Sequence, residues 1–130
     1  MATWDDVRRI ALALPETTER PSHDGVAAWR VRDKLFVWER PLRRADLEHL
    51  GDAAPRGPIL GARVADLVAK DGLVADEPRV YFTTPHFDGY AAVLVRLDEI
   101  AVADLEGLIV DAWLLRAPRR VAAAYLESAG

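Results

Sequence analysis

The stretch Val80-Tyr-Phe-Thr-Thr-Pro-His-Phe-Asp-Gly-Tyr90, which continues through Ala91-Ala-Val-Leu-Val-Arg-Leu97, is the segment around which the rest of the chain can be arranged. Its two flanks are rich in β-branched and aromatic residues, whereas Pro85 and the Asp88-Gly89 pair carry the chemistry of a turn. This pattern predicts two β-strands joined by a polar loop, residues 83–90, termed the hairpin tip below. The tip gathers hydroxyl, imidazole, carboxylate and phenol groups, so it is also a candidate site.

The composition is typical of a soluble chain with one hydrophobic core. The chain has 130 residues, of which 51% are hydrophobic and 29% are charged, so we expect a single domain over residues 1–130. Cysteine is absent, which excludes disulfides, thiol catalysis and cysteine-bound metals and favours the cytoplasm. We expect no leader and no membrane contact, because no apolar run approaches the ~18 residues of a transmembrane helix.

The order of the predicted elements defines the fold class. A helix with a capping box at Thr3 and Asp6 ends at Pro15, and the polar segment Glu16 to Gly25 is expected to be a loop. Before the hairpin we expect three strands: Val26 to Arg32, Leu35 to Glu39 and Ile59 to Val64. We expect four further helices: Ala45 to Leu50, Ala65 to Ala75, a long helix up to Ala117 and a last one through Glu127.

Short connections favour antiparallel pairing, and helices at the two ends of a chain most simply cover one face of a sheet. We therefore predict a two-layer α+β fold, with an antiparallel sheet of about five strands and the N- and C-terminal helices packed on one face. The other face is expected to be open unless a loop or a partner covers it. That open face is where we expect function.

Four segments together resemble a known family: Leu12-Ala-Leu-Pro15, Lys34-Leu-Phe-Val-Trp38, the segment from Tyr81 to Tyr90, and Asp111-Ala-Trp113 before Ala117-Pro118. The chain resembles, over essentially its whole length, the MmcQ/YjbR family of small bacterial proteins. The resemblance implies a CyaY-like α+β fold. It also implies DNA binding, by likeness to a "double wing" module that lays its sheet on a duplex; it supplies no catalytic residues.

For nucleic acid, the usable groups are arginines on and after the predicted strands: Arg30, Arg32, Arg40, Arg43 and Arg44. Guanidinium groups suit phosphate, and we expect Arg30 and Arg32 to project from the same side of one strand. However, 17 basic residues against 21 acidic ones, with a net charge of −4, are an ordinary surface count. Solvated arginines are therefore the alternative to a weak, salt-dependent DNA site.

For a small ligand, the candidates lie in the hairpin tip and on the neighbouring strand. His86 is the best proton carrier, Asp88 could orient it, Thr84 and Tyr90 could hydrogen-bond a ligand, and Trp38 could pack against one. The alternative is that these residue types only satisfy turn geometry. A concave aromatic pocket beside His86 would favour the small ligand, whereas a continuous positive surface would favour nucleic acid.

Catalysis and metal binding are less supported by the sequence. No nucleophile and base can be paired, so we expect a binding protein rather than an enzyme, with no cofactor. His23, His49 and His86 are not spaced as metal ligands, although the sequence leaves open whether the His23-Asp24-Gly25 turn meets the hairpin tip. An open apolar sheet face also predicts, as a further alternative, a homodimer or another protein interface.

Overall fold

The computed structural model describes residues 1–22 and 24–129. Its described part contains one antiparallel sheet with the strand order β1-β2-β3-β4-β6-β5. The strands are β1 Thr17–Pro21, β2 Ala27–Val31, β3 Lys34–Glu39, β4 Ile59–Arg63, β5 Tyr81–Phe82 and β6 Ala92–Arg96; the helices are α1 Trp4–Leu12, α2 Arg44–Leu50, α3 Leu67–Asp76, α4 Val102–Arg116 and α5 Arg119–Ala129. The α+β class and the antiparallel hairpin are confirmed.

The sheet has one strand more than expected, because the segment predicted as a loop contains β1. Thr17 pairs with Val31 and Pro21 pairs with Ala27, which places β1 at the edge of the sheet. Its residues are polar and mostly exposed, so no apolar alternation reveals it in the sequence. Proline is tolerated in such an edge strand, where its missing N–H faces away from the sheet.

The start of the chain follows the predicted capping box. The Asp6 backbone N–H donates to the Thr3 hydroxyl at 3.3 Å, and the Thr3 N–H donates to the Asp6 carboxylate at 2.9 Å. The helix then buries Val7, Ile10 and Ala11 on one face, as the spacing predicts. This face packs toward the sheet and α4.

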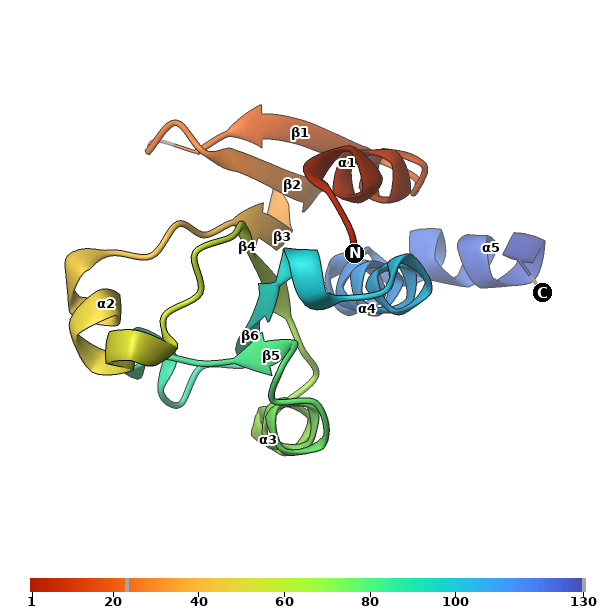
Figure 1. Ribbon diagram of the computed structural model, residues 1–130. Helices are drawn as coiled ribbons and strands as arrows, with labels where there is room; N and C mark the ends of the chain where they lie inside the picture. The colour runs from red at the N-terminus through yellow and green to blue at the C-terminus, as the bar shows by residue number, and fades with distance from the viewer. Residues whose placement is uncertain (23, 130) are drawn as a thin grey trace.

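The main core lies between the sheet and the two helices α1 and α4, which lie on the same side of it (Figure 1). Trp29, Val37 and Leu60 are fully buried there, together with Trp113 from α4. The Trp113 indole N–H donates to the Pro15 carbonyl at 3.1 Å, and this hydrogen bond fixes α4 to the end of α1. Terminal helices on one face are therefore confirmed.

The opposite face is only partly open. Ile59, Phe82, Phe87, Ala92 and Leu94 form a second, smaller core cluster there, and Trp38, Leu42 and Leu50 pack against it. Figure 1 shows α2 on the side of the sheet away from α4. The sequence predicts an open face unless a loop covers it, and over β4, β6 and β5 the hairpin tip and the α2 segment do cover it, because they carry apolar residues whose burial is favourable. The uncovered part lies over β2 and β3.

Candidate functional site

A groove with a volume of about 870 Å³ lies on this second face, between the β2–β3 strands and the hairpin tip. We term it the loop-face groove. Four of the five predicted ligand residues line it, and so do three of the five arginines predicted for nucleic acid: Trp38, His86, Asp88, Tyr90, Arg30, Arg40 and Arg43. Two sets of residues that the sequence suggested for different ligands therefore meet in one concave site.

Arg40 is a buried wall residue of the groove, not the exposed arginine that the sequence predicts. Its side chain is 6% exposed and pairs with the Asp46 carboxylate at 3.0 Å. Its Nη1 also donates to the Pro41 carbonyl, and the guanidinium lies over the Phe87 ring at 5.2 Å. The Arg40 Nη2 is buried and has no hydrogen-bond partner in the described structure. An unsatisfied buried donor is costly, so a bound acceptor would remove that cost.

Asp46 holds this arrangement in its charged form. Burial by itself raises the pKa of Asp46, but the Arg43 backbone N–H, which donates at 2.8 Å, and the Arg40 guanidinium outweigh it, so the pKa lies below its usual value. Asp46 lies on α2, two residues after Arg44. The sequence does not single out Asp46, because an acidic residue in the first turn of a helix is an ordinary helix-dipole feature.

The hairpin tip is held by Lys70, a residue that the sequence pattern does not single out either. Lys70 lies on α3 and is 4% exposed, and its ammonium donates to the carbonyls of Phe87 at 2.6 Å and Tyr90 at 3.0 Å. Burial lowers the pKa of Lys70, while the charges of Asp88 and Asp71 act in the opposite direction. A buried lysine bonded to two loop carbonyls fixes the conformation of the loop that carries His86 and Asp88.

Aromatic rings line the groove beside these charges. The Trp38 ring lies 6.4 Å from Phe87, and Phe87 lies 4.9 Å from His86 and 6.2 Å from Tyr90. Trp38 also lies across Gly61, where an added Cβ would approach the indole Cε2 to 2.3 Å. The absence of a side chain at Gly61 explains why the indole can lie against the sheet.

The charges of the groove are partly paired. Arg43 pairs with Asp24 at 3.4 Å, and Glu39 accepts a hydrogen bond from the Ala27 N–H at 3.3 Å. Arg30 is half-buried, and no carboxylate within residues 1–22 and 24–129 lies at ion-pair distance from its guanidinium. Among the described residues, Arg30 is therefore the arginine of the groove lining whose guanidinium has no carboxylate partner.

The remaining predicted residues lie outside the groove lining. Arg32 does not share a strand face with Arg30, because β2 ends at Val31 and Arg32 lies in the following turn with φ 46°, paired with Glu16. Arg44 is 95% exposed and pairs with Glu48 at 3.4 Å. Thr84 is the buried residue at the start of the tip. Its hydroxyl has no hydrogen bond of standard geometry to the described residues, although it helps to lower the pKa of Asp46.

The described part of the chain contains neither a cluster of metal ligands nor a helix that could span a membrane. No three histidine, aspartate or glutamate side chains gather there closely enough to hold a metal ion. His23 lies outside the described residues, so the question that the sequence leaves open, whether its side chain meets the hairpin tip, lies outside them too. No helix among residues 1–22 and 24–129 combines the length and apolarity needed to cross a bilayer.

A solved structure shares the fold of this chain, and a family model matches its sequence. The structure is similar to the crystal structure of Deinococcus radiodurans protein DR2400, described as a DUF419 domain, with a TM-score of 0.65 and 20% identity over 88% of this chain and 78% of that one. The YjbR family model matches residues 12–115. The chain belongs to the YjbR family, which confirms the resemblance seen in the sequence.

Relatives with full-length similarity come from two mycobacteria. A protein of Mycobacterium tuberculosis and one of Mycobacterium bovis, both described as uncharacterized, are each 57% identical to this chain over 133 residues, covering 100% of both chains. Their names assign no ligand or reaction, so the function has to be argued from the groove itself.

Proposed function

We propose that the protein binds a small anion that carries a planar ring, in the loop-face groove. The observation that carries this proposal is Arg40: a buried arginine whose Nη2 donor has no partner and which lies in the wall of the groove. Carboxylate and phosphate oxygens are the acceptors that complement a guanidinium group best. Arg30 supplies a second guanidinium from the neighbouring strand.

The aromatic residues support the planar part of the ligand. Trp38 is half-buried, and among the described residues none accepts a hydrogen bond from its indole N–H. Tyr90 is 47% exposed at the other wall, with the Arg63 guanidinium over its ring at 4.8 Å. Aromatic faces and a few convergent donors in a concave site are typical of small-molecule pockets. His86 and Asp88 lie at the rim, where they can contact the ligand.

Nucleic acid is the second candidate, because exposed arginines adjoin the groove and the family resemblance implies DNA. Arg43 and Arg44 have side chains that are 60% and 95% exposed, which suits phosphate contacts. Both pair with a carboxylate, and the chain carries a net charge of −4, so the arrangement favours the small anion. The same proposal includes that the chain is a single cytoplasmic domain and that it acts by binding rather than by catalysis. If the chain instead forms a homodimer through this face, sedimentation would detect the dimer.

A titration followed by heteronuclear NMR tests the proposal. Phenyl phosphate, benzoate and adenosine monophosphate are the small probes, and a short single-stranded oligodeoxynucleotide is the polymer probe. We expect the small anions to shift the Trp38 indole signal and the backbone signals of the hairpin tip. The Arg30→Met substitution should weaken this binding at least tenfold, since a lost charge-assisted hydrogen bond is worth roughly 1.5–3 kcal/mol and about 1.4 kcal/mol is a factor of ten.

Arg44→Met is the matched control, because Arg44 lies outside the groove lining. If the ligand is a small anion, Arg44→Met binds it as the natural chain does. If the ligand is a nucleic acid strand, both variants lose affinity and binding weakens steeply with salt. Equal binding of phenyl phosphate by the natural chain and Arg30→Met, or no shift of Trp38 with any probe, would contradict the proposal.

A further inference from the structure

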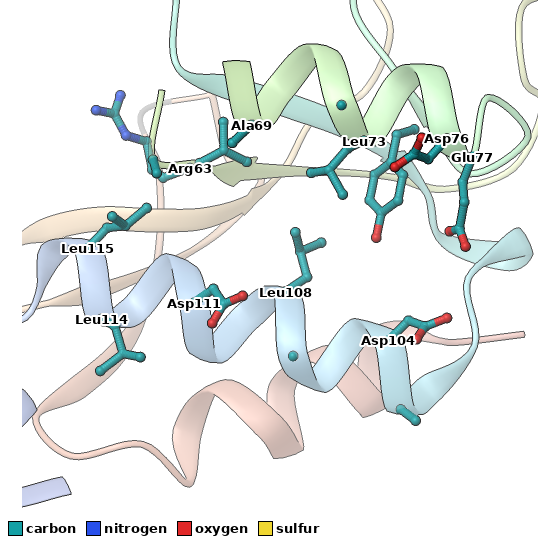
Figure 2. A pocket seen from close by; sticks show the side chains of 16 residues that line it. Arg63, Ala69, Leu73, Asp76, Glu77, Asp104, Leu108, Asp111, Leu114 and Leu115 are labelled. Atoms are coloured by element: carbon teal, nitrogen blue, oxygen red, sulfur yellow. The ribbon is translucent and has the colours of Figure 1, made fainter. Parts of the chain in front are cut away.

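A second cavity lies between α3 and α4, away from the loop-face groove, and it has a volume of about 860 Å³. We term it the helix groove; Figure 2 shows the side chains that line it. Its walls combine acidic and apolar residues from the two helices and from β5. Its acidic residues are Asp76, Glu77, Asp104 and Asp111, and Tyr81 of β5 lies among them.

The charge of the helix groove is negative. Asp76 and Glu77 lie at the end of α3, and Asp104 and Asp111 lie along the facing helix α4 (Figure 2). None of the four carboxylates pairs with a cation among residues 1–22 and 24–129. Arg63 also lines the cavity, but its guanidinium lies over the Tyr90 ring at 4.8 Å and points away from the acidic residues in Figure 2.

Tyr81 gives independent support for a ligand. The residue is 5% exposed and lines the helix groove, yet its hydroxyl makes no hydrogen bond to any residue of the described chain. Burial raises the pKa of the Tyr81 phenol, and the charges of Glu77 and Asp104 raise it further. The phenol therefore lies in the negative field of carboxylates from both walls, and its oxygen has no hydrogen-bond partner among the described residues.

Two glycines keep the groove open. Gly72 lies inside α3 and Gly107 lies inside α4, and an added Cβ at either position would meet nothing within 4 Å. Alanine at both places would fit and would make each helix more stable than glycine does. The two glycines therefore leave open space between the helices, although alanine at either position would make the fold more stable. Leucine side chains, among them Leu73 and Leu108, supply apolar surface beside it.

We infer that the helix groove binds an aliphatic polyamine. The carboxylates are spread along two walls, and no three of them within the described chain are close enough to hold a metal ion, so an extended cation fits better than a compact one. Ammonium groups would pair with Asp104, Asp111 and Glu77, and one would donate to the Tyr81 hydroxyl. The methylene segments between the ammonium groups would lie against the leucines and the two glycines.

An NMR titration with spermidine tests this inference on the full chain. We expect saturable shifts of the Gly72 and Gly107 amide signals and no shift of the Trp38 indole. Hexanol, which has the hydrocarbon without the charge, and potassium chloride at matched ionic strength should leave the two glycine signals unchanged. If potassium chloride reproduces the spermidine shifts, the effect is general screening and the inference is wrong.

Variants separate the groove from ordinary surface charge. Asp104→Asn combined with Asp111→Asn should weaken spermidine binding at least tenfold, because it removes two carboxylates from one wall. Glu106→Gln is the matched control, since Glu106 lies on α4 and is exposed but is not part of the lining; it should bind as the natural chain does. Equal affinity of the double variant and Glu106→Gln would overturn the inference.

A third variant tests the open space rather than the charge. Gly107→Leu should fill the groove and abolish the spermidine shifts while leaving the four carboxylates in place. Gly107→Ala shows whether the helix tolerates a side chain there; its signals should match the natural fold. Unchanged spermidine affinity in a folded Gly107→Leu variant would place the polyamine outside the groove. No charged residue lines both grooves. A failure of polyamine binding in the helix groove can therefore be told apart from a failure of anion binding in the loop-face groove.

Discussion

The two grooves are built in opposite ways. The loop-face groove has a buried ion pair, Arg40–Asp46, in its wall and a loop that a buried lysine, Lys70, holds in place. The helix groove lies between two regular helices, and its carboxylates are exposed at the surface. Substitution of Asp46 or Lys70 should therefore destabilise the fold, whereas substitution of the exposed carboxylates of the helix groove should alter binding alone.

Asp46→Asn has the largest expected effect. The substitution leaves the buried Arg40 guanidinium without its carboxylate, and breaking a buried pair from one side typically costs about 3 kcal/mol or more. Urea denaturation should show this loss of unfolding free energy at neutral pH. Glu48→Gln, whose partner Arg44 is 95% exposed, should change stability by less than about 0.5 kcal/mol; equal losses in the two variants would contradict a structural role for the pair.

The same pair predicts a pH dependence. The pKa of Asp46 is lower in the folded protein than its ordinary value, so the unfolded chain takes up the proton first as pH falls. The stability that Asp46 contributes is therefore complete above about pH 4 and is lost as pH falls through its folded pKa. Denaturation of the natural chain and Asp46→Asn should give converging stabilities at acidic pH. A difference that grows below pH 4 would have the wrong sign.

Lys70→Met tests the support of the hairpin tip. It removes two charge-assisted hydrogen bonds to the carbonyls of Phe87 and Tyr90, and we expect a loss of roughly 2–3 kcal/mol. Thermal and urea unfolding measure this loss, and the NMR signals of His86 and Tyr90 should broaden or shift. Lys34→Met is the matched control, because Lys34 is exposed. A tip whose signals stay in place without Lys70 would show that other contacts fix it.

Replacing glycine by alanine should have the smallest effects on stability, and these effects should have opposite signs at two positions. Gly61→Ala places a methyl group against Trp38 and should destabilise the fold by about 1–3 kcal/mol. Gly72→Ala meets open space inside α3 and should stabilise it by roughly 0.5–1 kcal/mol. Paired urea denaturation curves measure both. The same sign at both positions would contradict the packing described for Trp38, or the free space described at Gly72.

The sequence predicts the fold well where a pattern has one physical cause. The capping box at Thr3 and the buried stripe of α1 follow from spacing, and the hairpin follows from its apolar flanks and turn residues. β1 was missed because an exposed edge strand needs no apolar alternation. Arg32 was misplaced because the strand ends one residue earlier, in a turn where Arg32 and Asp33 both adopt positive φ.

The residues of the candidate sites also divide into those that the sequence can predict and those that depend on tertiary packing. His86, Asp88, Tyr90 and Trp38 could be chosen from the sequence because reactive residue types gather in one loop and on one strand, and the structure brings them together. Asp46 and Lys70 could not, since their roles depend on burial by segments distant in sequence. The helix groove gave no signal, because Asp104 and Asp111 have the appearance of a solvated helix face and only their packing opposite α3 creates a cavity.

The most direct measurement of the central claim is the set of nuclear Overhauser contacts between the ring protons of bound phenyl phosphate and the protein. If the loop-face groove is the binding site, the ligand protons show contacts to the Trp38 indole and to Tyr90, and these contacts weaken in Arg30→Met and persist in Arg44→Met. Contacts from the ligand to residues outside the groove would contradict this binding site. So would the absence of contacts to Trp38 and Tyr90 at ligand concentrations that saturate any observed shift.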